Sequence, residues 1–186
     1  MADRPAQFRI QPVSDPDQET LEVLAKTIVR DDEPLNIFGV FAHHPKLLKR
    51  FNLLGGFILN KGLLPVRERE IVILRVGWNA QSRYEFGQHT VIGRQCGLSD
   101  DEILRLTLPA DEGAWSPDDQ ALVDLCDDLQ SDDCVSADTW ARLSSRWNDA
   151  EMIELVVTAG FYRMVSGFLN STGVELDEGV PDFPMR

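Results

Sequence analysis

The sequence contains little cysteine and an excess of acidic over basic residues. Only three of its 186 residues are cysteine and none stands in a CxxC pair, so the sequence predicts neither a disulfide framework nor a zinc site. Its 18 Lys and Arg residues against 31 Asp and Glu residues give a formal net charge of −13. A surface of that charge repels phosphate backbones and anionic lipids. We therefore expect no nucleic-acid partner, no membrane partner and no bound metal, and the unpaired cysteines suit a reducing cytoplasm.

Motifs of the common cofactor-dependent and hydrolytic enzymes are also missing. There is no GxGxxG, no P-loop, no GxSxG and no EF-hand spacing, and these motifs mark dinucleotide, nucleotide, acyl-transfer and calcium sites. The first residues do not resemble a signal peptide, and no stretch approaches the apolar length expected of a membrane span. We therefore expect no cofactor, and any chemistry must come from a few side chains in a cleft.

Helical periodicity dominates the sequence, and no segment shows the alternation typical of a strand. With 43% hydrophobic residues, the chain can build one sizeable core. We expect an all-α protein of about eight helices in a single domain, residues 1–186. Two extended arms are expected, at residues 1–14 and 174–186. The expected helices run from about 16 to 30, 45 to 60, 65 to 79 and 82 to 97, begin at 99 and 117, and run from 136 to 143 and from 149 to 172.

The expected helix 45–60 is unusually apolar. From Phe51 onward it is hydrophobic nearly all round, and such a helix is either buried in a large core or shared with another subunit. Because the chain is too short to hide it completely, we expect a homo-oligomer. Gly55 and Gly56 lower helix propensity, and close approach of another backbone or of a bound ligand would explain them.

The chain is organised around the stretch from Glu70 to Leu98, whose second half is the expected helix 82–97. At about 100° per residue, Glu85 and His89 fall on the stripe expected to face the core. That stripe also carries Phe86, Ile92 and Cys96, and the opposite side carries Arg83, Gln88, Arg94 and Gln95. Glu85 and His89 are four residues apart and can touch across one turn. Such a buried pair suits proton transfer; a purely structural pair, or a helix rotated so that both are solvated, explains the spacing equally well.

The two other histidines precede the helix 45–60. His43 and His44 are adjacent and therefore point about 100° apart on a helix, which excludes a metal clamp. We expect one of them to cap the helix or contact a neighbour, and a role as a second proton carrier stays open.

Residues about 35 to 108 resemble a known family. Residues 64–70 read Leu-Pro-x-Arg-x-Arg-Glu, residues 84–89 read YEFxxH, and residues 97–103 read Gly-Leu-Ser-x-x-Glu-Ile. Together they resemble the carboxymuconolactone decarboxylase family, which includes the alkylhydroperoxidase-D-like proteins. The resemblance implies a multi-helical orthogonal bundle assembled as trimers or hexamers.

The peroxidase branch of that family uses a Glu, a Cys twelve residues on, a second Cys three further on and a His four beyond it. Those positions hold Glu70, Ser82, Glu85 and His89 here. Neither Ser82 nor Glu85 can supply the thiol chemistry of peroxide reduction. An antioxidant function, which we keep as an alternative, therefore requires Cys96 or another cysteine to reach the Glu70–His89 cluster.

The decarboxylase branch opens and decarboxylates a small lactone acid without a metal or an organic cofactor. The resemblance implies that His89 carries the proton, that Glu85 orients it and that Glu70 tunes or relays it. Substrate-binding candidates are Ser82, Tyr84, Arg75, His43 and His44, of which Arg75 or one of the two histidines would hold a carboxylate. We therefore expect a cofactor-free enzyme acting on a small lactone or keto acid. A non-catalytic, oligomeric small-ligand-binding protein is the third hypothesis, and a buried Glu85–His89 contact without an adjacent cavity would mark it.

Overall fold

The computed structural model describes residues 4–30 and 33–184 and confirms the all-α fold class. Within these residues the helices are α1 (Gln18–Leu24), α2 (Asn36–Phe41), α3 (Pro45–Asn60), α4 (Val66–Asn79), α5 (Arg83–Gln95), α6 (Asp100–Arg105), the 3-10 helix η1 (Ala110–Glu112), α7 (Pro117–Asp132), α8 (Ala137–Ser144) and α9 (Asp149–Thr172). A short antiparallel ribbon pairs β1 (Val29–Arg30) with β2 (Glu33–Pro34). The outer ends of the two expected arms, residues 1–3 and 185–186, lie outside the described residues.

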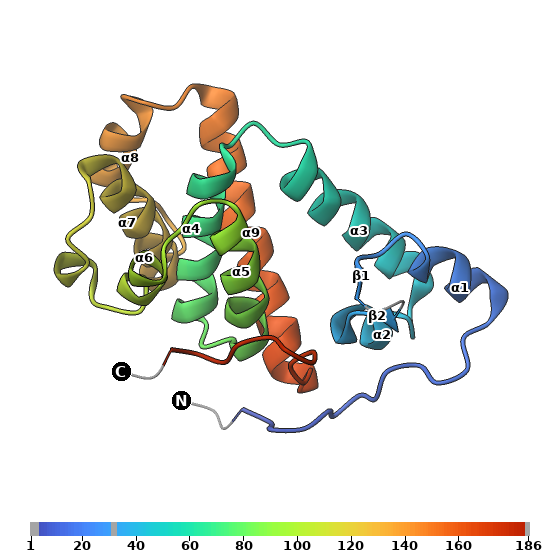
Figure 1. The fold of residues 1–186 in the computed structure, drawn as a ribbon. Helices are drawn as coiled ribbons and strands as arrows, with labels where there is room; N and C mark the ends of the chain where they lie inside the picture. The colour runs from blue at the N-terminus through green and yellow to red at the C-terminus, as the bar shows by residue number, and fades with distance from the viewer. Residues whose placement is uncertain (1–3, 31–32, 185–186) are drawn as a thin grey trace.

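Helix α4 forms the centre of the molecule (Figure 1). Every residue from Arg69 to Gly77 is buried, and α4 packs against α5, α7 and α9. A helix that is surrounded by protein on all sides has apolar residues on all of its faces. This burial accounts for the apolar run Ile71–Leu74. In Figure 1, α1, α2 and α3 stand to one side of the body formed by α4 to α9.

Capping residues set several helix starts as expected. The Nδ1 atom of His44 accepts a hydrogen bond from the backbone N–H of Leu47, with Pro45 in the first turn. Ser99 and Glu102 form a capping box at the start of α6. Ser82 occupies the N-cap position of α5, but its hydroxyl makes no capping hydrogen bond.

The first helix is shorter than its periodicity indicates. It begins after Asp17, whose carboxylate caps it, and it ends at Leu24 rather than near residue 30. The hydroxyl of Thr27 bonds the carbonyl of Leu24, and a side chain that satisfies the backbone in this way competes with helix continuation. Ile28 consequently lies outside the helix and is exposed.

Helix α9 is long and apolar enough to span a membrane by length and composition alone. The expectation that no stretch approaches such a length was therefore wrong for residues 149–172. More than half of its most apolar window is buried inside the protein, where it packs against α4 and α5. This burial is typical of a central helix in a protein core.

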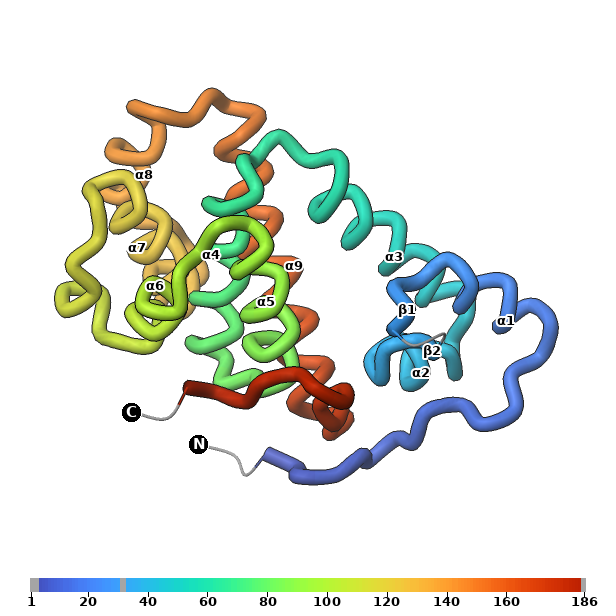
Figure 2. Tube along the Cα trace, viewed as in Figure 1, coloured from blue at the N-terminus to red at the C-terminus, as the bar shows by residue number. Residues whose placement is uncertain are grey.

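The N-terminal and C-terminal arms run along the surface and contact segments that are distant in the sequence (Figure 2). The N-terminal arm donates a hydrogen bond from the backbone N–H of Arg9 to the carbonyl of Thr172, and one from Val13 to Gly39. In the C-terminal arm, Asp177 accepts a hydrogen bond from the backbone N–H of Asn36. The arms thus connect α9 with the α2 region.

Candidate active site

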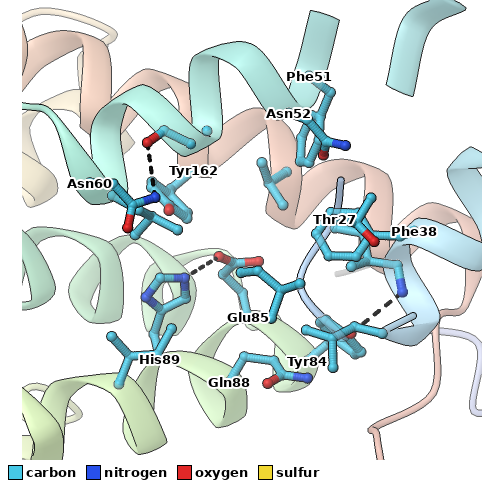
Figure 3. A pocket seen from close by; sticks show the side chains of 18 of the residues that line it. Thr27, Phe38, Phe51, Asn52, Asn60, Tyr84, Glu85, Gln88, His89 and Tyr162 are labelled. Atoms are coloured by element: carbon cyan, nitrogen blue, oxygen red, sulfur yellow. Dashed lines mark hydrogen bonds and ion pairs between the residues drawn. The ribbon is translucent and has the colours of Figure 1, made fainter. Parts of the chain in front are cut away.

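A cavity of about 420 Å³ lies between the α1–α3 side and helices α5 and α9 (Figure 3). This volume is in the range of small-molecule sites. Its apolar lining includes Ile37, Phe38, Phe51, Leu59, Phe161 and Val165. Its polar lining includes Thr27, Asn52, Asn60, Tyr84, Glu85, Gln88, His89, Gln95 and Tyr162, with Lys26 and Arg30 from the segment before β2.

His89 is held between two carboxylates. Its Nδ1 atom lies 2.7 Å from Oε2 of Glu70 on α4, and its Nε2 atom lies 3.2 Å from Oε1 of Glu85. The predicted contact between Glu85 and His89 across one turn is therefore present. A carboxylate only accepts hydrogen bonds, so both ring nitrogens must donate, and this requires the imidazolium form.

The pKa of His89 follows from this arrangement. Burial alone would lower it, but the charges and hydrogen bonds of Glu70, and then of Glu85, outweigh burial and raise the pKa to about 10. His89 is therefore protonated at neutral pH, which makes it a proton donor in the resting protein.

Arg69 completes the buried end of the cluster. Its Nε and Nη2 atoms donate to Oε1 of Glu70 at 3.0 and 2.9 Å, and Nη1 donates to the carbonyl of Leu59 at 2.7 Å. Burial alone would raise the pKa of Glu70, but His89 and Arg69 together lower it below its ordinary value. The sequence analysis missed Arg69, although it belongs to the Leu-Pro-x-Arg-x-Arg-Glu opening.

Tyr162 of α9 is a second residue that the sequence analysis missed. Its ring packs edge-on against His89 with the centroids 4.9 Å apart, and it lines the cavity. Burial, followed by the charges of Glu85 and Glu70, raises the pKa of Tyr162 well above its ordinary value. Its hydroxyl therefore stays protonated and can donate a hydrogen bond to a ligand oxygen.

The three basic candidates for holding a carboxylate lie outside the cavity lining. Arg75 donates to Asp127 on α7 and to the carbonyls of Leu106 and Leu108, so its guanidinium is occupied by structural bonds. The Nε2 atom of His43 contacts the carbonyl of Gln11 at 2.9 Å, and His44 caps α3. Each of these side chains has a structural partner away from the cavity, so this geometry does not favour them as substrate carboxylate ligands, and that role stays a prediction.

Tyr84 and Ser82 differ in their relation to the cavity. Tyr84 lines it, but its hydroxyl is engaged by Asp177 and by the backbone N–H of Ile37. Ser82 is fully buried, its hydroxyl has no hydrogen-bond partner among the residues that the structure describes, and it does not line the cavity. A direct substrate contact by Ser82 is therefore not favoured by this geometry and also stays a prediction.

Helix α5 is buried on more sides than its sequence indicates. Gln88 was expected on the side away from Glu85 and His89, yet it is buried and lines the cavity. Its amide donates to Asp177 of the C-terminal arm. The arm covers this part of the helix, and helical periodicity does not indicate that cover.

Cys96 lies near the cluster but outside the cavity lining. Its Sγ atom is 4.0 Å from Nη2 of Arg69. Burial, followed by the charge of Glu70, raises the pKa of its thiol despite the opposing effect of Arg69, which disfavours the reactive thiolate. Among residues 4–30 and 33–184, no group of three or more His, Cys, Asp or Glu side chains is arranged to hold a metal.

Comparisons with known proteins fit this geometry. Residues 45–127 match the Carboxymuconolactone decarboxylase family. The structure is similar to a peroxidase-related protein from Silicibacter sp. TM1040, with a TM-score of 0.80 and 14% identity over 96% of this chain and 95% of that one. A peroxidase-related protein with an alkylhydroperoxidase AhpD core, from Ralstonia eutropha JMP134, gives a TM-score of 0.73 and 18% identity over 95% of each chain.

The debrominase Bmp8 in its apo form is also similar, with a TM-score of 0.74 and 10% identity over 91% of this chain and 92% of that one. No curated protein matches the sequence. Identities this low show a common fold and not a common reaction. The fold is therefore AhpD-like, and the chemistry has to be argued from the cavity.

Proposed function

Because residues 45–127 of this chain belong to the carboxymuconolactone decarboxylase family, we propose that the protein is a cofactor-free acid–base enzyme acting on a small organic acid. The substrate class is a lactone or keto acid, and the reaction is loss of CO₂ or a proton shift. The observation that carries the proposal is the continuous series Arg69–Glu70–His89–Glu85, which begins in the core and ends at the cavity.

Each member of this series has a separate role. Arg69 and Glu70 fix His89 from the core side and favour its charged form. His89 stores a proton on Nε2, and Glu85 lies 3.2 Å from that atom at the cavity surface. When CO₂ leaves, the electron pair of the broken carbon–carbon bond stays on the substrate carbon. The proton on Nε2 of His89 is available to that carbon, and the carboxylate of Glu85 beside it can relay this proton.

The cavity supplies the surroundings that this chemistry requires. Phe38, Phe51 and Phe161 line it and limit its water content, which strengthens the interactions of the charged groups. The protonated hydroxyl of Tyr162 is suited to donate to oxygen atoms on which negative charge develops. A cavity beside the Glu85–His89 pair also argues against the third hypothesis, in which the pair is a relic without space for a substrate.

The test is a screen for turnover with small lactone and keto acids, with substrate loss followed by NMR and CO₂ release measured directly. Glu85→Gln keeps the size of the side chain but removes the carboxylate, and we expect it to lower kcat by about 10²-fold or more. Glu19→Gln is the matched control, because Glu19 is exposed on α1. Turnover by the parent that survives in Glu85→Gln, or no turnover of any acid tested, contradicts the proposal.

An alkylhydroperoxidase-like activity is the second candidate, and the contact of Cys96 with Arg69 is the observation in its favour. Cys96→Ser should then abolish peroxide turnover, whereas Cys134→Ser should not, because Cys134 is exposed. The raised thiol pKa of Cys96 and the replacement of the paired cysteines by Ser82 and Glu85 favour the acid–base enzyme. Peroxide turnover that depends on Cys96 would reverse this preference.

We further propose that the protein self-associates through α3 and acts in a reducing cytoplasm, without a nucleic-acid or membrane partner. Leu53 and Phe57 lie one turn apart on α3 and are 61% and 47% exposed, which leaves an apolar stripe for a second copy to cover. The three cysteines are unpaired, which suits that compartment.

A further inference from the structure

Among the cavity-lining residues that the structure describes, Asn52 of α3 has a buried side-chain donor that the protein leaves unpaired. Its Nδ2 atom is buried and makes no hydrogen bond within the described residues. Other buried polar atoms among the described residues also lack a hydrogen bond, on Ser82, Thr90, Thr158 and Ser166 and on Arg105 and Arg142, whose Nε atoms form ion pairs instead, but none of these residues lines the cavity. A buried donor without an acceptor is unfavourable, and a ligand oxygen in the cavity would satisfy it.

The surface of α3 around Asn52 leaves space for such a ligand. Gly55 and Gly56 follow it by three and four residues, on the same helix face, and both line the cavity. A Cβ atom added at Gly56 would meet no atom within 4 Å. Packing within the chain therefore does not require glycine at this position, and the open volume beside Asn52 is available to a bound molecule.

The two ends of the cavity differ in chemistry (Figure 3). Asn52 and Thr27 lie toward one end, and His89 lies toward the other with Glu85 beside it. Lys26 and Arg30 line the cavity from the same segment as Thr27. Within residues 4–30 and 33–184 neither forms an ion pair with a carboxylate, and Arg30 instead donates to the carbonyl of Glu178.

We propose that Asn52 is a substrate-binding residue that donates a hydrogen bond to a carboxylate oxygen of a flat, apolar monocarboxylic acid. The proposal deepens the acid–base function and rests on it for the identity of the reacting end. Because the carboxylate is bound away from His89, the proposal selects the proton shift, and not the loss of CO₂, as the reaction of such an acid. The carboxylate sits at the Asn52 end, and Lys26 and Arg30 of the cavity lining supply positive charge. The apolar body packs against Phe38, Phe51 and Phe161, and the far end of the molecule reaches Glu85 and His89.

Benzoate is the probe for this assignment, because it has the required shape and charge and cannot react as a lactone or keto acid. Binding is measured by calorimetry with the full chain. Asn52→Leu keeps the side-chain volume and removes the donor, and we expect it to weaken benzoate binding at least tenfold. We expect toluene, which lacks the carboxylate, to bind the parent and Asn52→Leu equally.

Asn60→Leu is the matched control, since Asn60 lies on the same helix and lines the same cavity. Its amide already donates to the carbonyl of Gly56 at 3.0 Å, so this variant should bind benzoate within twofold of the parent. Asn52→Asp is a second test variant that preserves the shape, and its charge should weaken benzoate binding at least as much as Asn52→Leu does.

Stability gives an independent readout. Loss of an unsatisfied donor should leave the melting temperature of Asn52→Leu unchanged or raised, whereas a structural role for the amide would lower it. Equal benzoate affinity in the parent and Asn52→Leu overturns the proposal. So does turnover of small acids by a parent that does not bind benzoate, although the acid–base function then stands. Benzoate binding that depends on Asn52, without turnover of any acid, supports Asn52 as a binding residue and contradicts the proposed acid–base enzyme.

Discussion

At the scale of single residues, His89 is held in its charged form by two carboxylates that reach it from different elements. Glu70 arrives from α4 and Glu85 from the same helix one turn earlier. The folded protein therefore binds a proton that the unfolded chain releases at a lower pH. This difference couples folding stability to pH.

We expect the parent to lose stability as the pH rises from about 6.5 to about 10, the interval between the unfolded and the folded pKa of His89. In this interval the folded state holds one proton more than the unfolded state, so the free energy of unfolding falls by up to about 1.4 kcal/mol per pH unit. Below pH 6.5 the contribution is complete. Urea denaturation at pH 7, 8 and 9 measures the slope.

His89→Gln should remove this slope in the range pH 7–9, although it also removes the interaction by which His89 lowers the pKa of Glu70. We expect the difference in the free energy of unfolding between the parent and His89→Gln to decrease steadily as the pH rises. Parallel stability curves would show that His89 is neutral in the folded protein.

The two glutamates of the cluster should differ in their effect on stability. Glu70 is completely buried, and its carboxylate pairs with both Arg69 and His89. We expect Glu70→Gln to lower the free energy of unfolding by about 3–5 kcal/mol, because it leaves buried positive charge uncompensated. Glu85→Gln, at the cavity surface, should cost about 1 kcal/mol. Chemical denaturation of the two variants at pH 7 compares them, and equal losses would contradict the separate roles given to these residues.

The sequence predicts part of this site for a physical reason. Glu85 and His89 are on one helix, and helical spacing alone brings them together. Arg69, Asn52 and Tyr162 come into the site through tertiary packing of α3, α4 and α9, and spacing within one helix cannot indicate that. The sequence also does not indicate that Arg75 pairs with Asp127, because a buried arginine can serve a structural ion pair as readily as a substrate.

At the scale of the elements, the C-terminal arm is seated directly on α5 at Gly87. A Cβ atom added at Gly87 would lie 2.3 Å from the carbonyl oxygen of Pro181 and 2.9 Å from Val180. The C-terminal arm can therefore lie against α5 in this way only because residue 87 is glycine and has no side chain. Since Gln88 and Tyr84 on the same helix also bond Asp177 of the arm, the arm helps to position the α5 side of the cavity.

We expect Gly87→Ala to displace the arm and to lower the free energy of unfolding by about 1–3 kcal/mol. Limited proteolysis should cut the arm faster in this variant than in the parent. Gly160→Ala on α9 is the control, because no atom lies within 4 Å of the added Cβ and alanine favours a helix. An arm as resistant in Gly87→Ala as in the parent would contradict this seating.

The sequence predicts the helices better than the segments between them. The starts of α3, α6, α7, α8 and α9 follow from capping side chains and prolines. The early end of α1 depends on local competition at Thr27. The path of the C-terminal arm depends on contacts with residues about ninety positions away along the chain. Periodicity contains no information about such contacts.

At the scale of the whole molecule, the apolar stripe of α3 stands out against a chain of net charge −13. Charge of one sign opposes association, so self-association requires substantial apolar burial. We expect Leu53→Glu to shift the protein toward the monomer in sedimentation velocity experiments, because it places a charge in the proposed interface. Trp140→Glu is the control on α8, which lies on the other side of the body from α3 (Figure 1). Identical sedimentation of Leu53→Glu and the parent would contradict an interface at this stripe.

The cavity is built from three separate portions of the chain: residues 26–60, helix α5 and helix α9. The acid–base residues lie on α5 and, behind it, on α4, outside the first portion. Substitutions in the first portion can therefore change which molecule fits without altering proton transfer. Evolution could diversify substrates in this way, and a protein engineer could exchange residues 26–60 between homologues as a specificity cassette while leaving the Arg69–Glu70–His89–Glu85 series untouched.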